Sequence, residues 1–419
     1  MMAEALLISA AALCRTSNQT TLSTTTTIMG LLKLATLSII LPATSYFCIL
    51  GLLIAFPSLQ THAFYLHRVS LTWFKDLNVP EAFGFLPNQV KSFSIQTSDG
   101  EKLHAWHVLP LGVYSRNQEH LLAAPSGSDL ALKLLRDDPE SRLVIYFHGT
   151  AGCLASGWRP DSYRGISSAS PDKIHVLTAD YRGYGQSTGM PSEDGLLLDG
   201  IAMVDWAIHQ AGIPASRIVI FGQSLGTAVA ISLIRHYASE IPAVSFSGTV
   251  LVASFSDVAT LTATYRIGGV IPVLSPLSRV PPLLAFFNSF LRSTWMSKDR
   301  IGEFIRRSES DAIAQKYHLT FIHAEDDTDI DCLHTDVLFW HAVNATKSIG
   351  IGYEELEHEK QLMKKEWGSG GWTVEWRTDK GLIRQEMLKY GVHDRLMAYP
   401  ATSLAILKAF QATDPGFGR

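Results

Sequence analysis

A serine stands between two glycines near the middle of the chain, in the motif Gly-Gln-Ser-Leu-Gly at residues 222–226. A run rich in Val and Ile precedes the motif, and an amphipathic stretch follows it. This order predicts a nucleophile elbow, a tight strand-to-helix turn that exposes the Ser224 hydroxyl. Gly222 and Gly226 suit such a turn because side chains there would clash across it. An ordinary glycine turn is the alternative, since the motif alone is a weak signal.

A serine hydroxyl is a poor nucleophile at neutral pH, so Ser224 needs a histidine base and an acid that orients this base. In chains with such an elbow, the acid and then the histidine follow the serine. His393 lies in a loop before the last predicted helix, and we predict that it is the base. The other downstream histidines suit this role less well, because His334 and His341 lie on an apolar helix and His358 lies in a charged stretch.

Four carboxylates follow the strand that we predict at residues 318–323: Glu325, Asp326, Asp327 and Asp329. One of them should be partly buried, accept a hydrogen bond from the imidazole and stay ionised. The others are expected to be solvated or to cap a helix. Their positions alone do not choose among them.

The oxyanion of an acyl-transfer transition state needs backbone N–H donors. Leu225, directly after the nucleophile, is predicted to supply one of them. The loop His148-Gly149-Thr150 follows the strand predicted at residues 142–147, and Thr150 is predicted to supply the other. We interpret His148 and Gly149 as structural support for this loop, with His148 as a second base being the alternative. No third ligand is spaced to complete a metal site with the histidines of the apolar helix, so neither a metal nor a cofactor is predicted.

Short apolar runs that alternate with helical patterns must position these residues. The runs cover 142–147, 174–179, 217–221, 249–255 and 318–323, and helical stretches include 196–210 and 225–240. This alternation predicts an α/β fold with a mostly parallel sheet and helices on both faces. A catalytic domain is predicted over 85–412, with an apolar, Pro-rich cap insertion at 257–312 and a Trp-rich insertion at 345–390.

The N-terminal region is organised differently. Residues 1–28 end in a Thr- and Ser-rich stretch and are predicted to be a disordered tail. Residues 34–56 carry no charge and would reach about 34 Å as a helix, so a transmembrane helix is predicted at 29–56. A buried helix or a cleaved signal anchor is the alternative. Residues 57–84 are predicted to be a juxtamembrane segment, and the flanking charges do not decide the orientation of the helix.

Composition excludes several other classes of protein. The 419 residues are 47% hydrophobic and 18% charged, which is too apolar for a disordered chain. A formal net charge of −4 without a long basic run gives no indication of a nucleic-acid partner. The four cysteines lie far apart and predict neither a zinc site nor a disulfide framework.

Five segments together resemble the membrane-bound lysophospholipid and monoacylglycerol lipase branch of the α/β-hydrolase-domain proteins. They are 147–152, 180–189, 222–227, 323–327 and 391–393, and the resemblance covers about residues 85–412. It implies the α/β-hydrolase fold and selects Asp327, the second aspartate of its pair, as the acid. It also implies that Asp180, Arg182 and Tyr184 brace the end of the sheet without a catalytic role.

The chain departs from this pattern at three places. Gln223 precedes the nucleophile where histidine is usual, the stretch after Asp327 lacks the usual proline, and the 345–390 insertion is long. Members of the branch act on the lumenal or outer side, and we predict a single-pass protein of the endoplasmic reticulum with a lumenal catalytic domain. Of the two glycosylation sequons, at Asn18 and Asn344, this placement favours Asn344.

Together these observations predict a membrane-anchored serine hydrolase that acts on the ester of a monoacyl lipid, with residues 257–312 forming a tunnel for the acyl chain. A protein thioesterase or a serine peptidase of the same fold is the first alternative. An inactive hydrolase fold that serves as an interaction module is the second. The sequence leaves the acyl length, the head group and the oligomeric state open.

Overall fold

The computed structural model describes residues 36, 38, 40–125, 127–267, 271–272, 275–310 and 316–418. The predicted tail at 1–28 and the first residues of the predicted transmembrane helix lie outside these ranges. The chain divides into two compact units, Met1–Gln60 and Thr61–Arg419.

A helix from Ile40 to Ala55 makes up most of the described part of the first unit, and most of its side chains are exposed. The next helix, α2, spans Pro57–Tyr65. No single helix in the described ranges is long and apolar enough to cross a bilayer, although these two together meet the criteria as a bent pair. The predicted transmembrane helix therefore stays a prediction.

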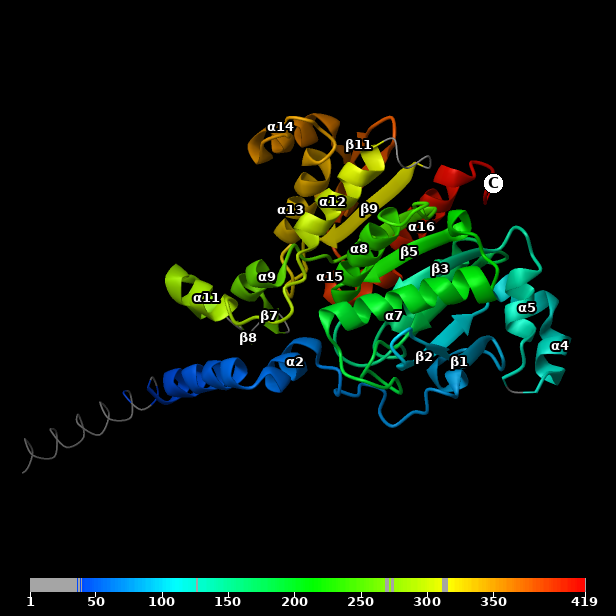
Figure 1. The fold of residues 1–419 in the computed structure, drawn as a ribbon. Coiled ribbons are helices and arrows are strands. Elements are labelled where there is room, and N and C mark those ends of the chain that lie inside the picture. The colour runs from blue at the N-terminus through cyan, green and yellow to red at the C-terminus, as the bar shows by residue number, and fades with distance from the viewer. Residues whose placement is uncertain are drawn as a thin grey trace, which may run out of the picture. The chain divides into compact units, whose positions relative to one another are not determined.

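The second unit is built on one ten-stranded sheet (Figure 1). In spatial order its strands are β1 (Val90–Gln96), β2 (Lys102–Val108), β4 (Ile174–Ala179), β3 (Arg142–Phe147), β5 (Ile218–Gln223), β6 (Gly248–Val252), β9 (Tyr317–Ala324), β12 (Gly381–Leu388), β11 (Gly371–Arg377) and β10 (Lys365–Glu366). The strands from β4 to β12 run parallel, and antiparallel pairs extend the sheet at both edges. The predicted mostly parallel sheet is confirmed.

Helices cover both faces of the sheet because its central strands are apolar on both sides. Strands β3, β4, β5, β6 and β9 are buried at every position. One face is covered by α7 (Glu193–Asp205), α8 (Leu225–Ala238), α12 (Ser297–Glu309) and α13 (Leu333–Asn344), and the other by α6 (Arg159–Ser168) and α16 (Pro400–Thr413) (Figure 1). Two hydrophobic clusters correspond to these layers. Three short helices precede β3: α3 (Leu111–Arg116), α4 (Gln118–Ala123) and α5 (Leu130–Arg136).

The predicted cap insertion is an excursion between β6 and α12. Its described elements are α9 (Val258–Thr264), β7 (Arg266–Ile267), β8 (Ile271–Pro272), α10 (Ser275–Ser278) and α11 (Pro281–Asn288). Its two ends meet, because the Val258 N–H donates to the Thr294 carbonyl at 2.9 Å. Helix α12 packs on α8 and α13, so the last part of the predicted insertion belongs to the main helical layer.

The Trp-rich segment at 345–390 is an extension of the sheet. It contains α14 (Tyr353–Met363), β10, β11 and β12. Strand β12 pairs in parallel with β9, and β11 returns antiparallel beside it. This segment therefore leads directly to the loop that carries His393.

Candidate active site

Ser224 lies at the sharp turn between β5 and α8. Its backbone has φ 53° and ψ −120°, which is unusual for a residue with a side chain. A Cβ atom on Gly222 would lie 2.4 Å from the Gly226 carbonyl oxygen, and one on Gly226 would lie 2.0 Å from the Phe147 carbonyl oxygen. Both flanking glycines are therefore required by close backbone contacts, and the turn has the geometry of a nucleophile elbow.

The structure brings His393 and Asp327 to this serine. Nε2 of His393 lies 3.0 Å from Oγ of Ser224, and Nδ1 of His393 lies 2.8 Å from Oδ2 of Asp327. Asp327 follows the carboxyl end of β9, and His393 belongs to the short helix α15 (Val392–Arg395) after β12. Because β9 and β12 are parallel neighbours, both residues lie at the same edge of the sheet as the elbow. A base placed between a hydroxyl and a carboxylate is the arrangement that nucleophilic acyl transfer requires.

Electrostatics favour a charged imidazole beside a charged carboxylate. Burial opposes ionisation of Asp327, but hydrogen bonds from His323 and His393 outweigh it and hold the pKa of this carboxyl well below its usual range. Burial alone would lower the pKa of His393, yet the hydrogen bond and the charge of Asp327 raise it above its ordinary value of 6.5. The pair therefore stabilises the imidazolium that forms when histidine accepts a proton.

Asp327 is held on both of its oxygens. Oδ1 accepts from the backbone N–H groups of Asp329 and Ile330, each at 3.0 Å. Oδ2 faces His393 and also lies 3.2 Å from Nε2 of His323. Oδ1 thus bonds to backbone N–H groups and Oδ2 to the two imidazole rings, which fixes the orientation of the carboxylate.

The neighbouring carboxylates have other partners. Glu325 forms an ion pair with Lys389 at 2.9 Å. Oδ1 of Asp326 accepts from the N–H groups of Gly391 and Val392, at 2.8 and 2.9 Å. Val392 has φ 43°, an uncommon value for a β-branched residue. Asp326 therefore holds the strained backbone directly before His393, a positioning contact that no sequence pattern indicates.

The other candidate histidines lie elsewhere. His334 is buried and hydrogen-bonds to Ser256 and Thr264 at the base of the cap. His341 lies half-buried next to Trp340 on α13, and His358 is exposed on α14.

Arg159, the first residue of α6, holds the loop after β3 through hydrogen bonds to its backbone carbonyls. The buried guanidinium donates to the carbonyl oxygens of Gly149, Thr150 and Ala151 at 2.9 to 3.0 Å, and to that of Cys153 at 2.5 Å. In a trans peptide the C=O and the following N–H point in opposite directions. The Thr150 N–H therefore points away from Arg159. No sequence motif predicts this role for Arg159.

His148 and Gly149 support the same loop. Nδ1 of His148 donates to the Gly149 carbonyl at 2.8 Å. Burial, together with the charge of Arg159, places the pKa of His148 well below its usual value, so its ring is neutral. A Cβ atom on Gly149 would lie 2.3 Å from Oε1 of Gln223 and 3.2 Å from Cβ of Ser224, so the loop passes directly over the elbow.

Gln223, which replaces the usual histidine, is almost fully buried. Its Nε2 donates to the backbone carbonyl of His393 at 3.4 Å. The elbow is thus joined to the histidine loop through a side chain as well as through the hydroxyl of Ser224.

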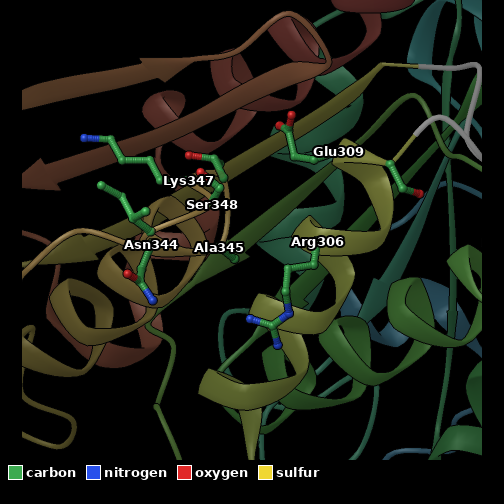
Figure 2. A pocket seen from close by; sticks show the side chains of 10 residues that line it. Arg306, Glu309, Asn344, Ala345, Lys347 and Ser348 are labelled. Carbon is green, nitrogen blue, oxygen red and sulfur yellow. The ribbon is translucent and has the colours of Figure 1, made fainter.

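A shallow hollow of about 650 Å³ lies away from these residues (Figure 2). Arg306 and Glu309 of α12 line one side, and Asn344 with the turn after α13 lines the other. Both helices run back from the carboxyl edge of the sheet, so this hollow lies at the opposite edge from Ser224. Oδ1 of Asn344 accepts from the Ile351 N–H at 2.7 Å.

Sheet order, elbow and loop placement are together those of the α/β-hydrolase fold. Residues 142–315 match the family described as alpha/beta hydrolase fold. A crystal structure of an alpha-beta hydrolase from Vibrio vulnificus superposes with a TM-score of 0.50 at 14% identity, covering 83% of this chain and 91% of that chain. The chain therefore has the α/β-hydrolase fold.

The chain is also similar to curated relatives from one branch of this fold. Lysophosphatidylserine lipase ABHD12 of Macaca fascicularis is 32% identical over 200 residues, which cover 45% of this chain and 46% of that protein. Protein ABHD12B of Homo sapiens is 27% identical over 301 residues, covering 70% of this chain and 74% of that protein. The resemblance to the lysophospholipase branch is thereby confirmed. The chain spans about half the length of the ABHD12 relatives that it matches.

Proposed function

We propose that this chain is a serine hydrolase that cleaves the acyl ester of monoacyl lipids, with lysophospholipids or monoacylglycerols as substrates. The observation that carries the proposal is the unbroken chain of hydrogen bonds from Asp327 through His393 to Ser224 at the elbow. The relatives named lysophosphatidylserine lipase support lysophospholipids as the first substrates to test.

In the proposed reaction, Oγ of Ser224 attacks the acyl carbonyl carbon while Nε2 of His393 takes the hydroxyl proton. The N–H groups of Thr150 and Leu225 donate to the oxyanion of the tetrahedral intermediate. The imidazolium returns its proton to the oxygen of the leaving alcohol, and the intermediate collapses to an acyl-enzyme. Water, deprotonated by His393, then attacks the acyl carbon, and the imidazolium returns this proton to Oγ of Ser224 as the fatty acid leaves.

The excursion between β6 and α12 is proposed to cover the acyl chain. Tyr265, directly after α9, is half-buried, and burial with the negative charges of Asp329, Asp394 and Asp327 raises the pKa of its hydroxyl to about 12. Residues 280–291 of the same excursion carry no charge, which suits contact with a fatty acyl chain.

Membrane attachment through the uncharged segment at 34–56 is also proposed, with a lumenal catalytic domain in the endoplasmic reticulum. An anchored enzyme would be held at the membrane into which amphiphilic substrates partition. Extraction of the full chain from membranes by alkaline carbonate would contradict this attachment.

The test uses the full chain in isolated membranes. A fluorophosphonate probe should label the wild type and not Ser224→Ala, and hydrolysis of lysophosphatidylserine should fall by about 10⁴- to 10⁶-fold in this variant. Ser239→Ala, which removes an exposed hydroxyl at the end of the same helix, is the matched control and should behave as wild type. An active Ser224→Ala protein would overturn the proposal.

Two further outcomes separate the alternatives. Release of fatty acid from acylated peptides, but not from lysophospholipid or monoacylglycerol, would indicate a protein thioesterase. A folded wild-type chain that the probe does not label would indicate an inactive hydrolase fold.

A further inference from the structure

The last carbonyl groups of α2 have no partner inside their own helix. Every α-helix leaves such carbonyls at its carboxyl end, and buried ones need hydrogen bonds from elsewhere. Here Leu66, with φ 47°, turns the chain away from the helix axis directly after Tyr65. The carbonyls of Phe64 and Tyr65 are therefore available to other parts of the catalytic unit.

Three donors from two other loops converge on the Tyr65 carbonyl oxygen. The hydroxyl of Tyr184 donates at 2.6 Å, the hydroxyl of Thr150 at 2.8 Å and the N–H of Ala151 at 3.2 Å. The Thr150 hydroxyl is also 3.0 Å from the Phe64 carbonyl oxygen. Two of the three donors thus belong to the loop whose N–H is proposed to bind the oxyanion.

The peptide between Thr150 and Ala151 is consequently held on both sides. Its carbonyl oxygen accepts from Arg159 at 3.0 Å, and its N–H donates to Tyr65. A trans peptide is rigid, so bonds at both ends fix its rotation. The Thr150 N–H belongs to the preceding peptide plane, whose Gly149 carbonyl accepts from the same Arg159 guanidinium at 2.9 Å. The two planes meet at the Cα atom of Thr150, whose hydroxyl also donates to Tyr65, so these contacts together constrain the direction of the Thr150 N–H.

The side chain of Tyr65 keeps its own carbonyl in place. Only 1% of this residue is exposed, and its hydroxyl lies 2.9 Å from Oγ of Ser293 at the base of the cap excursion. The next two residues, Thr294 and Trp295, donate their N–H groups to Glu193 at 2.9 and 3.1 Å. Tyr65 therefore connects the anchored base of the cap to the loop over the elbow.

We propose that Tyr65 is a positioning residue of the oxyanion site, whose carbonyl orients the Thr150–Ala151 peptide. The segment before the catalytic domain is then a part of the active site as well as a connection to the N-terminal helix. The proposal rests on the proposed hydrolase function, because the oxyanion role of Thr150 belongs to it.

The variants that test it remove donors to this carbonyl and leave the backbone donor intact. Thr150→Val replaces the hydroxyl by a methyl group of similar size, and Tyr184→Phe removes one oxygen. Loss of an oxyanion donor costs about 10²- to 10³-fold in kcat, so partial misplacement by either variant should lower kcat by about tenfold or more. KM should change by less than about twofold, because the oxyanion forms only in the transition state. Since both hydroxyls act on the same carbonyl, the losses in the double variant should not multiply.

Hydrogen exchange gives a second readout that does not depend on activity. The Ala151 amide should exchange about tenfold faster in each variant, the order expected when one hydrogen bond is weakened. Two controls remove buried hydroxyls elsewhere: Tyr317→Phe, which loses a bond to Glu309, and Thr373→Val, which loses a bond to the Gln385 carbonyl. Both should leave kcat and exchange at Ala151 unchanged.

The outcomes separate this proposal from the proposed function. If hydrogen exchange at the Ala151 amide is unchanged in both variants, Tyr65 does not position the Thr150–Ala151 peptide, even if Ser224→Ala is inactive. If hydrogen exchange at Ala151 is faster in both variants but kcat is unchanged, Tyr65 holds the peptide without an effect on the oxyanion, and the positioning role is overturned. If Ser224→Ala hydrolyses lysophosphatidylserine at the wild-type rate, the proposed function fails, and the exchange experiment alone decides whether Tyr65 holds the loop.

Discussion

Replacing Asp327 by asparagine should abolish most activity through the tautomer of His393. The two backbone N–H groups of Asp329 and Ile330 that bond to Oδ1 require an acceptor, so the amide oxygen of the new side chain should occupy this position. The NH₂ group must then face Nδ1 of the imidazole, at the position where Oδ2 lies 2.8 Å away. Nδ1 becomes an acceptor, and the ring proton moves to Nε2.

An imidazole with its proton on Nε2 cannot accept the proton of Ser224, although every distance in the site is preserved. The expected loss in kcat is about 10⁴-fold, equivalent to about 5 kcal/mol of transition-state stabilisation. Stability should fall less than activity, because the amide has the size of the carboxylate and keeps its two backbone bonds, although the contact of Oδ2 with Nε2 of His323 is lost.

The pH dependence provides a separate check. In the wild type, kcat/KM should rise with pH through the pKa of His393, which lies above 6.5, because only the neutral ring accepts a proton. The variant lacks the hydrogen bond and the charge that raise this pKa, while the burial that lowers it remains. The acidic limb of its profile should therefore move to lower pH. Hydrolysis of a p-nitrophenyl ester between pH 5 and 9, about the range in which histidine titrates, measures both effects. More than about 1% residual kcat, or a shift of the limb to higher pH, would refute this reasoning.

Two more substitutions test the parts that surround the triad. Gly149→Ala places a methyl group 2.3 Å from Oε1 of Gln223, so ester hydrolysis should fall by about 100-fold through displacement of the loop; Gly370→Ala, with open space around it, should not reduce the rate. Asp326→Leu removes the acceptor for two N–H groups before His393 and should lower kcat/KM by about tenfold, whereas Asp326→Asn keeps Oδ1 and should lose less. Equal rates for the leucine and asparagine variants would contradict this role for Asp326.

The parts of the site that could be predicted from the sequence are those that depend on local patterns or on chain order. The elbow is contiguous in the chain, so a β-branched run, two glycines and a helical pattern announce it. His393 was predicted because this topology delivers its base from a late loop. The structure places this histidine within hydrogen-bonding distance of Ser224, and its role stays a proposal.

Local sequence patterns cannot identify the acid of the site. Glu325, Asp326 and Asp327 are consecutive, and three carboxylates on one short turn have similar sequence surroundings. Only their directions in space differ, since one faces Lys389, one faces backbone N–H groups and one faces the imidazole. Resemblance to a family selected Asp327, and the residues alone did not.

Two residues and one strand could not be predicted because they produce no recognisable sequence pattern. Arg159 donates to backbone carbonyls of the loop after β3, and Tyr65 acts through its own backbone carbonyl. Any residue type can supply a backbone carbonyl, so these contacts leave no sequence pattern. Strand β12 was missed because its centre carries Arg384, Gln385 and Glu386, all buried, so it is not an apolar run. Its place in the sheet is determined by pairing with β9.

The two ends of the excursion between β6 and α12 meet each other, because the Val258 N–H donates to the Thr294 carbonyl. Segments of different length could be exchanged at this junction without moving any strand, because loop closure costs rise only slowly with length. For the proposed hydrolase, the segment that would contact the acyl chain is therefore separable from the strands that carry Ser224 and Asp327, and its length can change while these strands keep their places.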